Sequence, residues 1–303
     1  MDNLTHGLVG ALIGQAGLKR KTGLAMPALI IGANIPDLDG ACMLLGDMQH
    51  LALRRGITHG PIAWLLLPLA LATILWVFDR WQIKRGKRPP NRMPVHFGWL
   101  YGLSFIACLS HPALDWLNNY GVRLLEPFSS RWFYGDILFI IDLWLWLGLG
   151  FATWLSLRRE KKTGGDWRKP ARIALAGMLA YIGLNAAITW QAEHRVLASA
   201  PYPSVAIASQ VPVAFWQREV ISGNGDGIWH IGDFTVGDAP LDRCDLETAR
   251  AQDRTADSFL FWARAPFVER LASGAWRLGD ARFASRGGSR FSVELPPEAC
   301  RPA

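Results

Sequence analysis

Histidine and aspartate residues within the first 115 positions of the chain have types and spacings that are typical of metal ligands. His111 and Asp115 stand four positions apart in the segment HPALD, and on a helix this spacing places both side chains on one face, one turn apart. An imidazole and a carboxylate placed in this way can bind one metal ion. The segment therefore predicts part of a metal site.

Three earlier segments supply the other candidates. His6 opens the first apolar stretch, and His59 lies in RRGITHGP, just before a long apolar run. Asp37 and Asp39 lie two positions apart in NIPDLDG, so in an extended segment their carboxylates would point the same way. The predicted metal ligands are His6, Asp37, His59, His111 and Asp115.

The chemistry of this donor set indicates which reaction it could support. Imidazoles and carboxylates without a thiolate suit zinc, and also manganese or iron, as one ion or as a pair bridged by a carboxylate. Asp39 is then predicted to accept a proton or to orient a ligand. The sequence contains no serine nucleophile elbow, phosphate-binding P-loop or dinucleotide fingerprint. Metal-assisted hydrolysis is therefore the favoured reaction class.

Two arginines follow HPALD within a few residues. Arg123 and Arg131 lie in NNYGVRLLEPFSSRWFYGD, and arginine is suited to bidentate recognition of phosphate. We predict that they bind the substrate. The alternative is that these arginines and the neighbouring aromatic residues anchor the chain to lipid head groups. In the same region, Asp136 is predicted to cap the next helix and Asp142 to pair within the helical bundle.

The elements that position these residues are predicted to lie in a membrane. The chain has 303 residues, of which 50% are hydrophobic and only 19% charged, whereas a soluble protein has roughly 25% charged residues. A spanning helix needs about 20 mostly apolar residues. Four segments are predicted to span: 61–78, 95–117, 137–157 and 171–190. Two shorter apolar stretches, 8–18 and 24–35, are predicted to form short helices packed against the bundle.

Basic loops orient these helices, because Lys and Arg stay on the cytoplasmic side of a membrane. Residues 79–92 contain six Lys and Arg residues, and residues 158–172 contain seven. Tracing the chain from these loops places all five predicted ligands at the outer face, whereas His96 lands at the inner face. The net charge of +7 comes largely from these loops, so nucleic-acid binding is not predicted.

The last part of the chain has a different character. From about residue 195, alternating and aromatic runs such as GIWHIGDFTV are separated by Gly- and Asp-rich turns, which is typical of strands. We predict a mostly α-helical membrane domain over residues 1–192 and a small β-rich extracytoplasmic domain over residues 193–303. Cys244 and Cys300 either pair there or remain two thiols.

Several motifs, in their order and spacing, resemble the YdjM type of bacterial membrane-bound metal-dependent hydrolases. They are DNLTHGLVGA, IPDLD, RRGITHGP, HPALDWLNNYG and LLEPFSSRWFYGDILFIID, and they cover most of residues 1–145. The resemblance implies a zinc hydrolase of the bacterial inner membrane. The family is distantly similar to zinc-dependent phospholipase C and nuclease P1, and by that likeness the same five residues match metal ligands.

Together, these features predict a multi-pass inner membrane protein with a metal site at its periplasmic face. The expected function is hydrolysis of a phosphoester in a lipid or lipid-linked substrate, because the site would lie at head-group depth. Membrane lipids are the expected partners. The alternative is a non-catalytic membrane protein whose polar residues brace the helical bundle and whose tail binds a partner.

Overall fold

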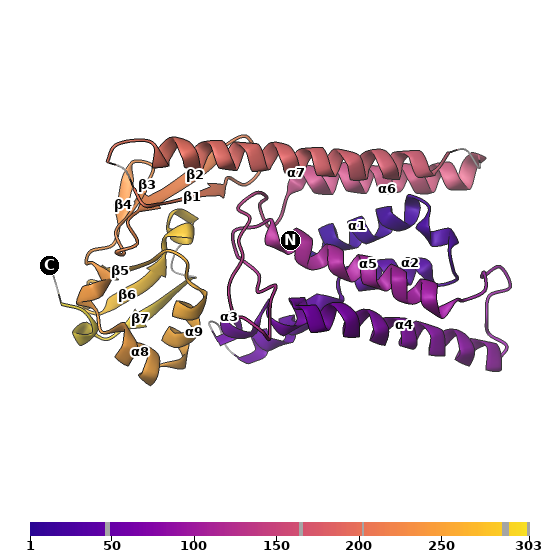
Figure 1. Cartoon of the computed structure of the whole chain (residues 1–303), viewed down its shortest axis with the longest axis horizontal. Coiled ribbons are helices and arrows are strands. Elements are labelled where there is room, and N and C mark those ends of the chain that lie inside the picture. The colour runs from indigo at the N-terminus through magenta and orange to yellow at the C-terminus, as the bar shows by residue number, and fades with distance from the viewer. Residues whose placement is uncertain (46–48, 164–165, 202, 287–290, 302–303) are drawn as a thin grey trace. The chain divides into compact units, whose positions relative to one another are not determined.

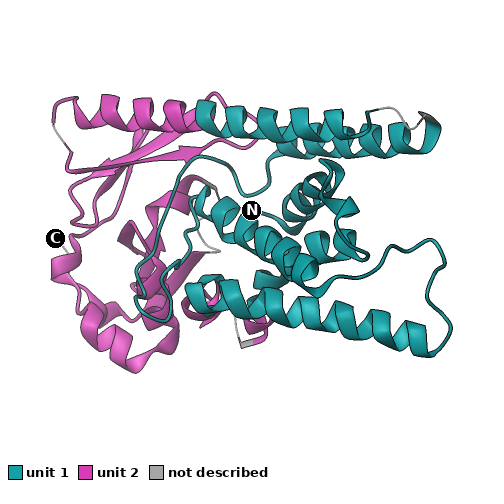
Figure 2. Cartoon of the chain, turned by 45° about the vertical axis from the view of Figure 1, so that its right-hand side comes forward, with its two compact units in different colours: residues 1–39, 55–184 teal, residues 40–54, 185–303 magenta. Residues whose placement is uncertain are grey.

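The computed structural model describes residues 1–45, 49–163, 166–201, 203–286 and 291–301. The chain divides into two compact units, which Figure 2 colours separately. The first unit consists of residues 1–39 and 55–184, and the second of residues 40–54 and 185–303. The second unit therefore takes one short segment from the early part of the chain.

The first unit is helical. Its helices are α1 (Asn3–Gln15), α2 (Ala25–Gly32), α4 (Pro61–Lys84), α5 (Phe97–Trp116), α6 (Leu143–Thr163) and the first part of α7 (Arg168–Leu197). Three 3₁₀ helices connect them: η1 (Leu18–Arg20), η2 (Ile35–Leu45), which runs on into the second unit, and η3 (Ile57–His59). The two short apolar stretches of the sequence thus form the short helices α1 and α2, as predicted.

Three helices of the described part of the chain are long and apolar enough to cross a membrane, namely α4, α5 and α7. The predicted span over residues 137–157 is wrong in its extent. Helix α6 begins only at Leu143, after Asp142 accepts a hydrogen bond from the backbone N–H of Leu145 at 3.0 Å. Its uncharged part ends at residue 157, before Arg158, so it is only about 22 Å long, less than the hydrocarbon thickness.

Two acidic residues near the start of α6 differ in role. Asp142 also accepts a hydrogen bond from the Tyr181 hydroxyl of α7 at 3.0 Å, as expected for a residue that pairs within the helical unit. Asp136 was predicted to cap this helix, and that prediction is wrong. Residues 137–142, which form no helix or strand, separate Asp136 from the first residue of α6.

Close backbone contacts hold the short helices in place (Figure 1). Helix α2 packs against α1 and α5, and α5 packs against α4. Gly10 of α1 allows the approach of α2, because a Cβ at Gly10 would lie 2.5 Å from the Leu29 carbonyl oxygen. Gly32 acts in the same way toward α5, with an added Cβ 3.1 Å from the Ser104 carbonyl oxygen. These contacts bring α1, the end of α2 and α5 together.

The second unit contains two antiparallel sheets. The first sheet has the order β1 (Val205–Gln210), β2 (Arg218–Gly223), β3 (Trp229–Ile231) and β4 (Phe234–Val236). The second has the order β5 (Pro266–Arg270), β6 (Trp276–Asp280) and β7 (Ser292–Leu295). Ile207 pairs with Ile221 and Ile221 with Ile231 across the first sheet, and all three lie in one apolar core.

Among its described residues, the second unit also contains the end of α7, short 3₁₀ helices, and the helices α3 (Gln49–Leu53), α8 (Leu246–Gln252) and α9 (Arg254–Trp262). Helix α3 comes from the early segment and packs against α9. Cys244 and Cys300 form a disulfide, which settles the alternative that the sequence left open. The β-rich prediction for the tail is therefore incomplete, because helices α8 and α9 lie between the two sheets in the sequence.

Candidate metal centre

The predicted ligands come from four elements of the first unit. His6 lies on α1, Asp37 on η2, His59 at the end of η3, and His111 and Asp115 on α5. The histidines and Asp115 are completely buried. The close packing of α1, α2 and α5 described above is what brings segments more than 100 residues apart to one place.

Four of these residues form a compact donor group. Asp37, His59, His111 and Asp115 each offer one nitrogen or oxygen atom, and these atoms all lie within 4.8 Å of one another. Oδ2 of Asp115 is 3.4 Å from Nε2 of His59 and 3.6 Å from Nε2 of His111. Oδ1 of Asp37 lies 3.6 Å from the same His111 atom. The predicted i,i+4 pair on α5 thus faces a common point together with His59 and Asp37.

The donor atoms of this group fit a metal ion. Within the part of the chain that the structure describes, no hydrogen bond of acceptable geometry reaches Nε2 of His59 or His111, Oδ1 of Asp37 or Oδ2 of Asp115. A buried polar atom without a partner costs about 1–3 kcal/mol. Four such atoms at one point would all be satisfied by a single cation, and nitrogen and oxygen donors suit zinc, manganese or iron.

Hydrogen bonds on the opposite ring nitrogens orient both histidines. Nδ1 of His111 lies 2.7 Å from the carbonyl oxygen of Ala33, which can only accept, so Nδ1 carries the proton. Nδ1 of His59 lies 2.9 Å from the Thr58 hydroxyl, which in turn donates to Oδ2 of Asp39 at 2.8 Å. Both imidazoles therefore offer the lone pair of Nε2, an arrangement typical of metal-binding histidines.

His6 lies beside the group of four rather than within it. Its ring stacks on that of His111 with 3.8 Å between centroids, and its Nε2 is 3.2 Å from Oδ1 of Asp115. Burial lowers the pKa of His6 to about 4, with a further contribution from the neighbouring His111. His6 is therefore neutral near pH 7, as a metal ligand must be.

Asp37 carries a negative charge at the edge of the group. Burial alone would raise its pKa, but the contacts with His111 lower the pKa to about 2. At His59, too, burial and the neighbouring charges shift the pKa in opposite directions. Burial alone would lower the pKa of its imidazole, whereas the contacts with Asp115 and Asp39 raise it above the ordinary value.

Comparison with known proteins identifies the family to which the chain belongs. The family model described as YdjM inner membrane protein matches residues 1–192. The chain belongs to the YdjM family. The uncharacterized protein YfhP of Bacillus subtilis (strain 168) is 30% identical over 140 residues, which make up 44% of this chain and 39% of YfhP. No solved structure matches the chain significantly.

Membership of the YdjM family makes this chain an inner membrane protein. The three apolar helices α4, α5 and α7 agree with that assignment. The family match covers every residue of the donor group and ends within α7.

Asp39 does not point the same way as Asp37 in this YdjM protein, contrary to the expectation for an extended segment. The segment is a 3₁₀ helix with about three residues per turn, so residues two apart project in different directions. Asp37 faces His111, whereas Oδ2 of Asp39 lies 3.5 Å from Nδ1 of His59. Asp39 thus contacts His59, a predicted ligand, on the side of the imidazole that faces away from the donor group.

Arg55 is the residue at this site that sequence reasoning missed. Its guanidinium is buried, its Nε lies 3.0 Å from Oδ2 of Asp115, and its Nη1 donates to Oδ1 of Asn118 at 3.0 Å. The α-amino group of Met1 also contacts Asp115. The available signal was the position of Arg55 in RRGITHGP, four residues before His59, but arginine before an apolar run is ordinarily a surface residue.

The two predicted phosphate-binding arginines differ in their surroundings. Arg123 is nearly buried, donates to Oε1 of Glu126 at 2.7 Å, and lies near enough to Asp39 for their charges to interact. Arg131 is exposed and its guanidinium lies 5.5 Å from the centre of the Phe133 ring. His96, which was excluded from the site, precedes α5 at the end opposite to His111.

Proposed function

We propose that this YdjM protein is a multi-pass, metal-dependent hydrolase that cleaves a phosphoester of a lipid or lipid-linked substrate. The proposed metal is zinc, as one or two ions, with manganese or iron as alternatives that metal analysis distinguishes. The proposed ligands are His6, Asp37, His59, His111 and Asp115. The observation that supports this proposal most strongly is the group of four donor atoms within 4.8 Å of one another, none of which makes a hydrogen bond among the described residues.

The chain's own residues would prepare the site for hydrolysis. A bound divalent cation would supply Lewis-acid polarisation of a phosphoryl oxygen and would lower the pKa of a water molecule. The Ala33 carbonyl and the Thr58 hydroxyl hold the two imidazoles in the required tautomer. Asp39, with Oδ1 unbonded among the described residues, is the proposed proton acceptor. Arg123 and Arg131 are the proposed phosphate contacts.

Exposed apolar residues beside the ligands favour an amphiphilic substrate. Leu38, next to Asp37, is 64% exposed, and Ile57, two residues before His59, is 65% exposed. Large aliphatic side chains in such positions are costly in water but favourable against acyl chains. A lipid or lipid-linked phosphoester would cover them while its head group reaches the donor atoms.

Two features support an outward-facing site. Helix α4 begins next to His59 and ends at Lys84 before a basic segment, and basic segments stay in the cytoplasm. The Cys244–Cys300 disulfide supports an oxidising location for the tail, as in the periplasm. We therefore propose that the metal centre and the second unit lie on the extracytoplasmic side. This orientation requires that α6 also crosses the membrane, with the arginines near its end reaching the cytoplasmic surface, because its uncharged part is short.

Metal analysis of the purified full chain tests the proposal. After incubation with zinc and removal of excess metal, we expect about one or two zinc ions per wild-type chain by elemental analysis. His111→Ala should retain almost none. His96→Ala, at the other end of α5, is the matched control and should equal the wild type. Equal near-zero occupancy in the wild type and in His111→Ala would eliminate the metal centre.

An activity measurement tests the reaction itself. The zinc-loaded chain is incubated with phospholipids and with polyprenyl phosphates, and released phosphate or phosphorylated head group is measured. We expect turnover that a chelator abolishes and that zinc restores. A protein that binds stoichiometric zinc but releases no product from either class would retain the metal centre and contradict the phosphoesterase.

The contacts of Arg55 favour a second candidate, in which the polar residues only brace the helices. Arg55 and the α-amino group of Met1 already place positive charge on Asp115. A bracing role predicts that His59→Ala abolishes folded protein in the membrane, because breaking a buried ionic network costs about 3–5 kcal/mol. The metal centre predicts folded protein that has lost zinc.

A further inference from the structure

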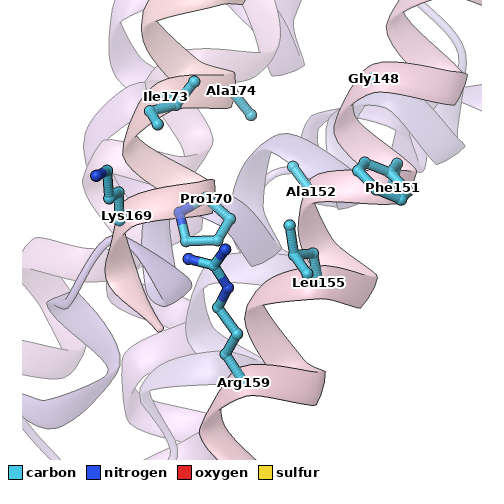
Figure 3. Close-up of a pocket in the computed structure, with 9 residues that line it drawn as sticks. All are labelled: Gly148, Phe151, Ala152, Leu155, Arg159, Lys169, Pro170, Ile173 and Ala174. Atoms are coloured by element: carbon cyan, nitrogen blue, oxygen red, sulfur yellow. The ribbon is translucent and has the colours of Figure 1, made fainter. Parts of the chain in front are cut away.

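A groove runs between α6 and α7 in the first unit, away from the donor group in sequence. One cavity of about 350 Å³ in this groove is lined by Gly148, Phe151, Ala152, Leu155, Arg159, Lys169, Pro170, Ile173 and Ala174. Figure 3 shows these residues, with the Arg159 side chain extending toward Pro170 between the two helices. The lining is apolar except at one end, where two basic residues lie.

A second cavity continues the groove. It has a volume of about 340 Å³ and shares Gly148, Ile173 and Ala174 with the first. Its further lining residues reach Trp144 on α6 and are almost all apolar. From Arg159 to Trp144 the groove follows α6 for about 22 Å, which exceeds the roughly 15 Å hydrocarbon thickness of one leaflet.

Charge and apolar surface are separated along this groove. Arg159 and Lys169 lie at the end where α6 stops and α7 starts, and the neighbouring Glu160 pairs with Lys19. The apolar side chains lie toward the middle of both helices, and Phe151 and Ile173 are about 60% exposed. A ligand that matches this pattern has an anionic head and a long apolar chain.

We infer that the α6–α7 groove binds an anionic membrane phospholipid, with its phosphate at Arg159 and Lys169 and an acyl chain along Gly148 toward Trp144. Basic pockets between membrane helices bind such head groups, and each basic residue near an anionic lipid contributes about fivefold in affinity. The site is separate from the proposed metal centre, because none of its lining residues belongs to the donor group. It is a structural or regulatory lipid site rather than a substrate site.

Native mass spectrometry of the full chain in detergent tests the inference. The probes are dioleoyl phosphatidylglycerol, dioleoyl phosphatidylcholine and inorganic phosphate. We expect one tightly bound phosphatidylglycerol molecule per chain and an at least tenfold lower affinity for phosphatidylcholine. Millimolar phosphate should not displace the phosphatidylglycerol. Equal binding of the two lipids would overturn the inference, and so would efficient competition by phosphate, because that would indicate an anion site without an acyl chain.

Paired charge variants locate the head group. Arg159→Gln with Lys169→Gln should weaken phosphatidylglycerol binding about twenty-fivefold, as expected from two contributions of about fivefold. Arg158→Gln with Lys161→Gln removes the same charge from α6 without touching the cavity lining and should change binding less than threefold. An equal loss in both double variants would mean that only the general basic charge attracts the lipid, which contradicts a built site.

Paired glycine variants locate the acyl chain. A Cβ added at Gly148 or at Gly150 meets no atom within 4 Å, so α6 should tolerate leucine at either position. Gly148 lines both cavities and Gly150 lines neither. Gly148→Leu should weaken binding roughly fifteenfold, because its side chain would displace about two methylenes of the acyl chain and each contributes about fourfold. Gly150→Leu should bind normally. Dimer peaks that Gly148→Leu removes would instead identify a second copy of the chain as the occupant and overturn the lipid.

Discussion

Two buried carboxylates, one in each compact unit, have opposite surroundings. Asp280 in β6 accepts hydrogen bonds from the backbone N–H groups of Arg264 and Arg282 at 2.8 and 3.0 Å, and from Nε and Nη2 of Arg282 at 2.9 and 2.8 Å. Both oxygens of Asp280 are therefore satisfied. Asp115 in α5 also has a nearby arginine, but its Oδ2 lacks a hydrogen bond among the described residues and faces two bare imidazole nitrogens.

The difference separates a structural ion pair from a candidate metal-binding site. The Asp280–Arg282 pair is closed, because the protein itself supplies every partner that the carboxylate needs. Around Asp115, imidazole nitrogens and carboxylate oxygens lie close together without hydrogen-bond partners among the described residues. Such buried polar atoms lower the stability of the fold unless another group binds them. Asp115 and Asp280 are both buried carboxylates beside an arginine. They differ in whether both carboxylate oxygens have hydrogen-bond partners.

The largest expected effect concerns the closed pair. Asp280→Asn leaves the completely buried Arg282 without its counter-charge and should reduce the free energy of unfolding of the second unit by about 3–5 kcal/mol. Denaturant unfolding of the full chain, followed by tryptophan fluorescence, measures this change. Asp257→Asn breaks an exposed pair with Arg250 and should cost less than about 1 kcal/mol. Equal, small effects would mean that Asp280 is not a structural residue.

A somewhat smaller effect is expected from the covalent link in the same unit. The Cys244–Cys300 disulfide joins residues 56 positions apart, so replacing both cysteines by serine should cost about 2–4 kcal/mol of unfolding free energy. A reductant should shift the wild type by the same amount and leave the double variant unchanged. Cys42→Ser, which changes a cysteine outside the disulfide, serves as the control. No shift on reduction would show that the link does not stabilise the unit.

At the open site the expected effect is on metal affinity rather than on folding. Thr58→Val removes the hydroxyl that connects Nδ1 of His59 to Asp39, and loss of such an outer partner weakens metal binding about 10- to 100-fold. Zinc titration by calorimetry measures the affinity. Thr58→Ser keeps the hydroxyl and should bind zinc like the wild type. An affinity unaffected by Thr58→Val would mean that the hydroxyl does not orient His59.

The smallest expected effect is a pH dependence of the second unit. Burial alone would raise the pKa of Asp280, but the charge and hydrogen bonds of Arg282 hold its pKa below the ordinary value. Because the pKa is lower in the folded state, this carboxylate contributes stability above the unfolded pKa of about 3.9, and the contribution is lost as the pH falls further. Unfolding free energy measured from pH 7 to pH 3 should decline below about pH 4, and Asp280→Asn should remove that part of the decline.

Local spacing made much of the site predictable. The i,i+4 interval of His111 and Asp115 needs only a helix to bring both side chains to one face, and the apolar content of residues 97–116 ensured that helix. The side of the membrane reached by each segment then grouped His6, Asp37 and His59 with them. Their roles as metal ligands stay predictions until metal is measured.

Features that depend on tertiary contacts were not predictable from the sequence. The buried position of Arg55 follows from its contacts with Asn118 and the Gly121 carbonyl, more than 60 residues away. The late start of α6 was missed because residues 137–142 are as apolar as the helix that follows. Helix α3 lies in the segment 40–54, and the rest of its unit begins at Asn185. No local sequence pattern predicts a packing partner so distant in the chain.

Because residues 40–54 belong to the second unit, the protein cannot be cut into its two units at a single position. The segment leaves at Asp39 and returns at Arg55, and the two ends are tied by a hydrogen bond of 2.7 Å from the Arg55 N–H to Oδ2 of Asp39. A fragment cut after residue 192 would keep α3 but lose α9, on which α3 packs, and the excised tail would lack α3. Such a cut would therefore keep the whole of the first unit but divide the second, so that neither fragment would contain both helices of the α3–α9 contact.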